Sequence, residues 1–336
     1  MLKINEGDYI YASARIRAKE AKLLGTSHYD RMIDAPSAEM AYKVLAEAEY
    51  GFERGVLSDV FAYERLLSDE LRKCYGLLLE IAPQAEVVKV FQRRYDYFNA
   101  KVLLKAEFSG REAPDILSDV GTIGTACIVR MIRERDYGEF TPSMKKALTD
   151  AYDVFSRTQD PQTVDFILDK ASYHQLSSDL YNIGSRYLHT IADILSDSVN
   201  IRMYIRARLL NKTWDFVKKL LLEDGTISEA VYHRNCDSSI DAFVESIRGT
   251  PYSNVVLKGW ELSRIRKDTA ILEKLLDEYL MGFVRSARFI SMGVEPMIAW
   301  LFAKETEIRN VRIIITGRIN SLPAELIRER LRTGYV

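Results

Sequence analysis

A short block of residues recurs three times in this chain, and no other feature of the sequence restricts the fold as strongly. Each copy has eleven positions. It begins with an acidic residue, and an asparagine follows three residues later. After the asparagine come an apolar, a basic and an apolar residue, one unrestricted position, an aliphatic residue, a basic residue or threonine, and finally a small residue. The copies occupy residues 96–106, 197–207 and 307–317. Their asparagines are Asn99, Asn200 and Asn310, which lie 101 and then 110 residues apart. A period of this length predicts three successive structural units.

The polar positions of the block need partners. On a helix, the acid and the asparagine three residues later share one face, and the apolar positions of the block put that face against a neighbour. A polar group buried there without a hydrogen bond costs roughly 1–3 kcal/mol. Free backbone groups at a neighbouring helix end or loop can supply those bonds. We therefore predict that these side chains dock each block helix on its neighbour: Asp96, Asn99, Asp197, Asn200, Glu307 and Asn310.

Two other interpretations of the acids are weaker. Solvated charges on three unrelated helices would not keep an acid, an asparagine, a base and a small residue at constant spacing. Catalytic acids would make three equivalent sites, yet no copy contains a second acid, a histidine or a cysteine. The sequence thus predicts no catalytic residue, no cofactor-binding residue and no cofactor.

The two basic positions of the block lie one helical turn apart on a different, more solvated face. If the three copies are arranged alike, these cations gather in related places and become candidates for binding a partner. The candidate partner-binding residues are Lys101, Lys105, Arg202, Arg206 and Arg312.

The rest of the chain predicts an all-α fold. Helix formers are abundant, proline is scarce at 8 residues, and no run alternates strictly enough to be a strand. Gly121 and Gly124 are interpreted as a turn, and Gly317 is placed to end the third block helix. Spacing and start and stop signals predict helices at residues 9–24, 60–81, 85–108, 142–155, 162–180, 191–209, 213–222, 238–247, 262–291 and 296–317, with further short helices after Pro36 and after Pro323.

Composition and motifs exclude several classes of protein. A formal net charge of −1 gives no basic field for nucleic acid. The longest apolar runs fall far short of the ~20 residues of a membrane span. His233 and Cys236 lie close together but lack a second ligand pair, so no metal site is predicted. The cluster Arg328–Arg332 suits the C-terminal end of a helix, with a partner contact as the sharper alternative. Three scattered cysteines are typical of a reduced, intracellular protein.

At these residues the chain resembles the C subunits of the archaeal and bacterial V/A-type ATPases, a family related to the d subunit of the vacuolar ATPase. The resemblance covers essentially the whole chain. It is strongest at Asp8–Arg17, Tyr95–Asn99, Asp197–Arg202 and Glu295–Val336, and most specific at 303–312 and 328–332.

The resemblance implies a funnel of three similar helical domains around a pseudo-threefold axis. We place them at residues 1–90 (completed by the C-terminal segment), 91–190 and 191–294, with 295–336 carrying the third block. It also implies a non-catalytic rotor component, monomeric within its complex, that couples the central shaft (the D subunit with F attached) to the membrane rotor ring during proton or sodium transport. Such a protein is cytoplasmic and peripheral on the membrane. A free helical-repeat scaffold that binds a peptide or helix is the alternative, and an enzyme is a distant third.

Overall fold

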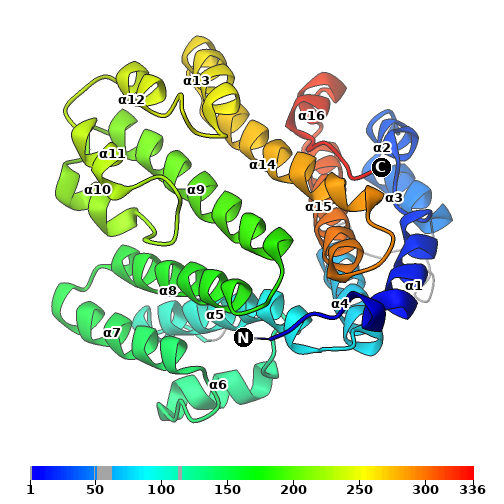
Figure 1. The fold of residues 1–336 in the computed structure, drawn as a ribbon, viewed down its shortest axis with the longest axis horizontal. Coiled ribbons are helices and arrows are strands. Elements are labelled where there is room, and N and C mark those ends of the chain that lie inside the picture. Colours follow the sequence, from blue (N-terminus) through cyan, green and yellow to red (C-terminus); the bar gives the residue numbers. More distant parts are fainter. Residues whose placement is uncertain (1, 49, 51–62, 113–115) are drawn as a thin grey trace. The chain divides into compact units, whose positions relative to one another are not determined.

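The protein is built from helices throughout the part of the chain that the structure describes. A computed structural model describes residues 2–48, 50, 63–112 and 116–336. These residues form sixteen α-helices and two short 3-10 helices, and they contain no strand beyond an isolated bridge between Leu2 and Ile183 (Figure 1). The predicted all-α class is therefore confirmed. The first three residues of the predicted helix at 60–81 lie outside the described residues.

The chain divides into two compact units, with one boundary between Lys3 and Ile4 and the other two within α5 (Glu86–Phe108) and α14 (Ala270–Val284). The first unit comprises Met1–Lys3 and Lys89–Glu273, and the second comprises Ile4–Val88 and Lys274–Val336. The division into three domains stays a prediction.

The first unit has a bundle core followed by an aromatic cluster. Apolar residues of α5, α6, α7 and α8 form one continuous core, in which Leu104 and Leu148 are fully buried. Beyond it, Tyr204, Tyr232 and Phe243 pack their rings together and join α9, α11 and α12. The complete helices of this unit are α6 (Thr125–Glu134), α7 (Pro142–Thr158), α8 (Pro161–Tyr181), α9 (Arg186–Leu209), α10 (Trp214–Leu220), α11 (Glu229–Arg234), α12 (Ile240–Ser246) and α13 (Ser253–Arg266).

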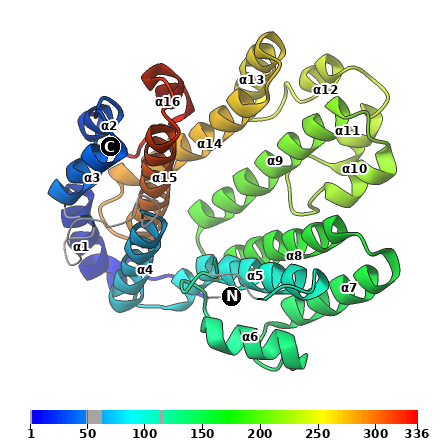
Figure 2. The same cartoon turned by 180° about the vertical axis from the view of Figure 1, so that it is seen from behind.

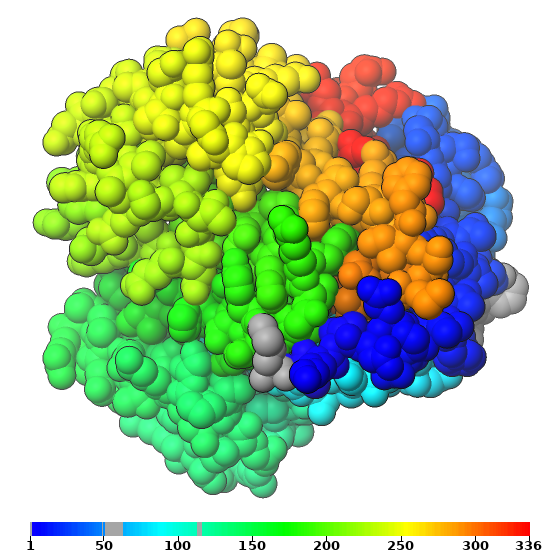
Figure 3. Space-filling model, in the orientation of Figure 1, coloured from blue at the N-terminus to red at the C-terminus, as the bar shows by residue number. Residues whose placement is uncertain are grey.

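The second unit surrounds one central helix, α15. Seventeen of its 26 residues are buried, so it has no solvated face of ordinary width. It packs against α1, α2, α3, α4 and α16, and both ribbon views show α4 alongside it (Figures 1 and 2). The surface of these C-terminal helices borders that of the N-terminal helices (Figure 3). The elements are η1 (Glu6–Tyr9), α1 (Ile10–Glu20), α2 (Thr26–Ile33), α3 (Ala38–Glu47), α4 (Tyr63–Ile81), η3 (Arg285–Phe289), α15 (Val294–Ile319) and α16 (Ala324–Arg330).

Local signals explain where several helices begin. Thr141 caps α7 through the backbone N–H of Met144, and Asp160 caps α8 through that of Gln162. Each cap is followed by a proline at the first helical position, where the missing N–H costs nothing. Both starts were predicted from these residues and are confirmed.

One predicted helix is wrong, and several short ones were missed. Residues 262–291 do not form a single helix, because the chain breaks after Arg266. There Lys267 adopts a left-handed conformation with φ 55°, and Asp268 accepts a hydrogen bond from the N–H of Ala270. The missed helices α2, α6 and α11 have 8, 10 and 6 residues, too few turns for a clear periodic pattern.

Gly317 does not end the third block helix, as the sequence suggested. The helix α15 continues to Ile319, and Ser321 at φ 54° then turns the chain. A Cβ atom on Gly317 would lie 2.7 Å from Cγ1 of Ile327 in α16. The glycine is therefore needed for the close approach of α16, not for helix termination.

We predict that Gly317→Ala lowers the free energy of unfolding. The added methyl group overpacks the contact with Ile327, which costs about 1–3 kcal/mol. The matched control is Gly282→Ala in α14, where no neighbouring atom lies within 4 Å of the new Cβ. That change should be neutral or stabilising by up to about 1 kcal/mol through helix propensity. Urea unfolding followed by circular dichroism measures both, and equal effects would contradict the packing argument.

Candidate functional site

Each block asparagine forms the same two-bond clamp on a single backbone residue. Asn99 donates from Nδ2 to the carbonyl of Ser118 (2.8 Å) and accepts the N–H of Ser118 at Oδ1 (2.7 Å). Asn200 holds Leu222 with bonds of 3.0 and 2.7 Å. Asn310 holds Arg332 with two bonds of 2.8 Å. All three asparagines are buried, and each satisfies the N–H and the C=O of a residue that lies outside any helix.

The block acids accept hydrogen bonds from residues that immediately precede a helix. Asp96 accepts from the hydroxyl of Thr122 (2.6 Å) and the N–H of Ile123 (3.2 Å). Asp197 repeats both bonds with Thr226 and Ile227 at the same lengths. In the third block, Glu307 accepts the N–H of Leu24 at 2.5 Å and also the hydroxyl of Tyr50.

These three backbone N–H groups occupy equivalent places. Ile123, Ile227 and Leu24 each lie two residues before the first residue of a helix, namely α6, α11 and α2. A carboxylate at this place satisfies a donor and stabilises the positive end of the helix dipole. The three blocks thus use one hydrogen-bonding scheme. In the third block the loop comes in two pieces, Arg332 near the C-terminus and Leu24 near the N-terminus.

A second repeated signal in the sequence was missed. Gly121-Thr-Ile was interpreted as a simple turn, but the same tripeptide recurs at Gly225-Thr-Ile. In both copies a Cβ atom on the glycine would collide with the block acid, and at Gly225 it would lie 2.5 Å from Oδ1 of Asp197. A search for short repeats that accompany the main block would have found these loops.

Burial changes the ionisation of the first block acid. Removal from water raises the pKa of the Asp96 carboxyl above its ordinary value. The hydrogen bonds from Thr122 and Ile123 favour the charged form and offset only part of that increase. The Arg93 guanidinium also lowers the pKa, by a smaller amount.

The third block contains a buried ionic cluster, which the other two blocks do not show within the described residues. The Lys304 ammonium forms ion pairs with the carboxylates of Glu307 (2.6 Å) and of Glu70 in α4 (2.8 Å). It also donates a hydrogen bond to the hydroxyl of Tyr50 (3.2 Å). Burial alone would lower the pKa of the Lys304 ammonium, but the carboxylates, Glu307 first, raise it above its ordinary value. Burial raises the pKa of the adjacent Cys74 thiol to about 12. This cluster ties α4 to α15.

The candidate partner-binding cations are paired within their own units. Lys101 bonds Asp169 (2.7 Å), Lys105 bonds Asp165 (2.9 Å) and Arg206 bonds Glu273. Arg202 donates to the carbonyl of Ser198, and Arg312 pairs with Glu64 at 2.9 Å. Four of them, all except Arg312, lie in the first unit, and three of those four line a single groove. Their role in binding a partner stays a prediction.

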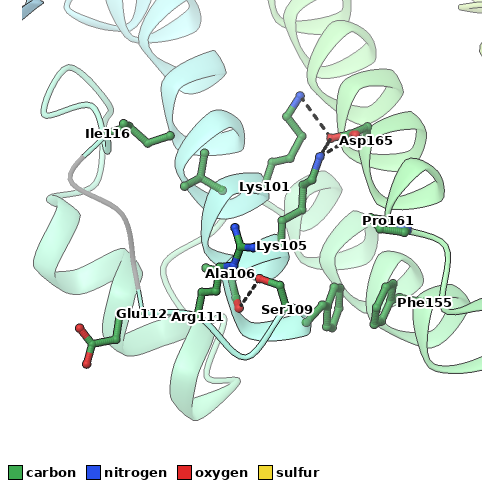
Figure 4. Close-up of a pocket in the computed structure, with 12 residues that line it drawn as sticks. Lys101, Lys105, Ala106, Ser109, Arg111, Glu112, Ile116, Phe155, Pro161 and Asp165 are labelled. Carbon is green, nitrogen blue, oxygen red and sulfur yellow. Dashed lines mark hydrogen bonds and ion pairs between the residues drawn. The ribbon is translucent and has the colours of Figure 1, made fainter.

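A hollow of about 520 Å³ lies beside two of these cations in the first unit. Lys101 and Lys105 both reach toward Asp165 across its rim, while Phe155 and Pro161 lie on its apolar side (Figure 4). The ring of Phe108 stacks on that of Phe155, with centroids 3.8 Å apart. The described lining residues contain no histidine or cysteine and only two carboxylates, Glu112 and Asp165, which gives little scope for acid–base chemistry.

The remaining sequence features have structural partners. Arg328 pairs with Asp30 and Asp34 of the N-terminal segment, and Arg332 pairs with Asp277. His233 packs its ring against Trp214. Among the described residues, no cluster of three or more metal-ligating side chains occurs. The described helices also include none long and apolar enough to cross a membrane.

Comparison with known proteins identifies the family. Residues 12–330 match the family model described as the ATP synthase (C/AC39) subunit. The chain therefore belongs to the family of V/A-type ATPase C subunits, and the predicted family is confirmed.

Full-length relatives agree with this assignment. The C subunit of the V-type sodium ATPase of Enterococcus hirae is 25% identical over 336 residues, covering 98% of this chain and 99% of its own length. The C subunit of the A-type ATP synthase of Methanocaldococcus jannaschii is 26% identical over 98% of this chain and 87% of its own. That of Haloferax volcanii is 24% identical over 96% of each chain.

We predict that Asn200→Ala destabilises the first unit by roughly 2–5 kcal/mol, because it leaves the N–H and C=O of Leu222 buried without partners. The control is Asn254→Ala, at an exposed position in α13 of the same unit. Thermal unfolding by calorimetry measures both variants. If the two lose equal stability, the clamp has no special energetic role.

The Lys304 cluster predicts a loss of stability at alkaline pH. The pKa of Lys304 is higher in the folded protein than in the unfolded chain, where it is about 10.4. Its contribution to the free energy of unfolding is therefore complete below about pH 10.4 and is lost as the pH rises through the pKa of the folded state. Lys304→Met should lower the free energy of unfolding by about 3–5 kcal/mol at pH 7, because two carboxylates lose their buried partner.

Urea unfolding of both proteins between pH 7 and pH 11 tests this prediction. The stability difference between wild type and Lys304→Met should narrow above pH 10. Exposed lysines titrate alike in the two proteins, so the comparison isolates Lys304. A difference that widens with pH would contradict the assigned sign.

Proposed function

We propose that the three hydrogen-bonded blocks mark three related domains arranged around a pseudo-threefold axis. Support comes from a hydrogen-bonding scheme that recurs in all three blocks. In each block the asparagine clamps a loop residue, and the acid accepts the backbone N–H of a residue just before a helix. The proposed domains are residues 1–90, 91–190 and 191–294, the first completed by 295–336. In each domain the block fixes its helix to a loop through the same hydrogen bonds.

We propose further that the protein is a rotor component of the central stalk in a V/A-type ATPase. It couples the shaft, made of the D and F subunits, to the membrane rotor ring and has no catalytic site of its own. The observation that carries this proposal is the family match over residues 12–330. The protein stays on the cytoplasmic side and reaches the membrane through the complex, where it serves proton or sodium transport.

The docking contacts suit the transmission of torque. A part that passes rotation from one partner to another must not yield at its internal joints. Buried polar contacts that are fully hydrogen-bonded make the surrounding structure rigid. Three such joints in one chain, with a buried ion cluster at the third, stiffen it where partners would load it.

The block cations are proposed as contacts to the shaft. Lys101, Lys105, Arg202, Arg206 and Arg312 occupy corresponding positions in the three blocks. All of them lie outside the buried polar scheme, so they can be changed without breaking a clamp. The ion pairs of Lys101, Lys105, Arg206 and Arg312 lie at partly exposed positions, where such pairs contribute about 0–1 kcal/mol.

We predict that reversing these cations weakens shaft binding and leaves the fold intact. The variant Lys101→Glu with Arg202→Glu should lose roughly tenfold or more in affinity for the purified D–F shaft, measured by biolayer interferometry. Its far-UV circular dichroism should match that of wild type. The control pair is Lys146→Glu with Arg157→Glu, both exposed on α7. Normal shaft affinity after reversal would remove these residues from the proposal.

Co-purification tests the proposed function itself. Tagged protein should capture the shaft and the ring from detergent-solubilised membranes, and the isolated chain should hydrolyse no ATP. If the shaft does not co-purify with the protein, the rotor proposal is overturned and the free helical scaffold is favoured instead.

A further inference from the structure

A long groove runs along the first unit beside the hollow already described. It has a volume of about 650 Å³ and lies between successive turns of α8 and α9, with α10 closing one side. On α8 the lining residues follow helical spacing from Gln162 to Tyr173, and on α9 from Val199 to Arg206. Lys101 and Asp165 line both the groove and the hollow, so the two are adjacent.

The walls of the groove carry more positive than negative charge. Five cations face three carboxylates: Lys101, Lys170, Arg202, Arg206 and Lys219 against Asp165, Asp169 and Glu273. Two of the cations are poorly neutralised. Lys219 forms no ion pair with any described residue, and Lys170 reaches only Glu223, at 3.9 Å, whose side chain is 86% exposed.

The floor of the groove is apolar and held in place. Val199 and Leu222 are buried beneath it, and Phe166 and Met203 contribute partly exposed apolar surface. Leu222 is the residue that Asn200 clamps, so the floor cannot shift without breaking two buried hydrogen bonds. The α8 wall extends over the twelve residues from Gln162 to Tyr173, a rise of about 16 Å, which is the length of a three-turn helix.

We infer that this groove binds an amphipathic helix of about three turns that carries carboxylates beside an aliphatic stripe. The aliphatic stripe would cover Val199, Phe166 and Met203. The carboxylates would meet Lys170 on one wall and Lys219 on the other. The inference deepens the proposed function and rests on it, since it names the chemistry of the partner that the block cations would recognise.

The acids of the groove then act as competitors of the partner. Asp169 and Glu273 hold Lys101 and Arg206 in the unbound protein. An incoming carboxylate exchanges for them, so the cations stay positioned without being permanently neutralised. Neutralising these acids should therefore strengthen binding, the opposite of what a merely structural ion pair would show.

The test uses the full chain and two synthetic peptides, stapled to remain helical. One carries leucine at positions i, i+3 and i+7 with flanking glutamates, and the other has lysine in place of each glutamate. Fluorescence anisotropy should show the acidic peptide binding at least roughly tenfold more tightly than the basic one. Lys170→Glu with Lys219→Glu should remove most of that preference, and Asp169→Asn with Glu273→Gln should increase affinity. Lys146→Glu with Arg157→Glu should change nothing.

Each outcome decides the inference. Equal binding of the two peptides, or an acidic peptide insensitive to Lys170 and Lys219, overturns it. Binding of the protein to anionic lipid vesicles through the same two lysines, without peptide preference, also overturns it in favour of a membrane contact. If the wild type captures the shaft but neither peptide, the groove inference fails and the rotor proposal stands. If it binds the acidic peptide but no shaft, only the rotor proposal fails.

Discussion

The structure depends on one constraint: an asparagine buried in an apolar helix face must bond through both its amide groups. A loop residue whose own backbone N–H and C=O lack partners meets this need, because the asparagine can accept from the N–H and donate to the C=O. Asn99, Asn200 and Asn310 each meet this requirement in the same way. The solution is demanding, because the loop must present both groups of one residue at bonding distance. Helix position and loop conformation are consequently specified together, and each stabilises the other.

The all-α fold class could be predicted from the sequence, and so could the need of the block acids and asparagines for hydrogen-bond partners. Both predictions rest on short-range periodicity. The acid and asparagine three residues apart, repeated three times, predicted buried groups in search of backbone partners. Which backbone groups they meet could not be predicted. Ser118 and Leu222 follow their asparagines by 19 and 22 residues, across loops with no regular pattern. The partner of Glu307 lies 283 residues away, beyond the reach of any local signal.

The errors have physical causes as well. Gly317 looked like a helix stop because glycine favours left-handed conformations, yet the space it leaves is occupied by Ile327. The same ambiguity hid the role of Gly121 and Gly225, which make room for carboxylates. A glycine can serve conformation or space, and the sequence alone does not separate them. Lys267 shows the converse, since a helix broke at a residue with no breaking tendency.

The bond between Glu307 and Leu24 has a consequence for how the chain is made. A ribosome adds about 5–20 residues per second, so roughly 15–60 seconds separate the synthesis of these two residues. The helices of the first unit emerge within that interval and have all their block partners at hand. The N-terminal helices α1 to α4 must wait with apolar faces uncovered until α15 emerges. These helices therefore expose apolar surface on the nascent chain for longer than the helices of the first unit do.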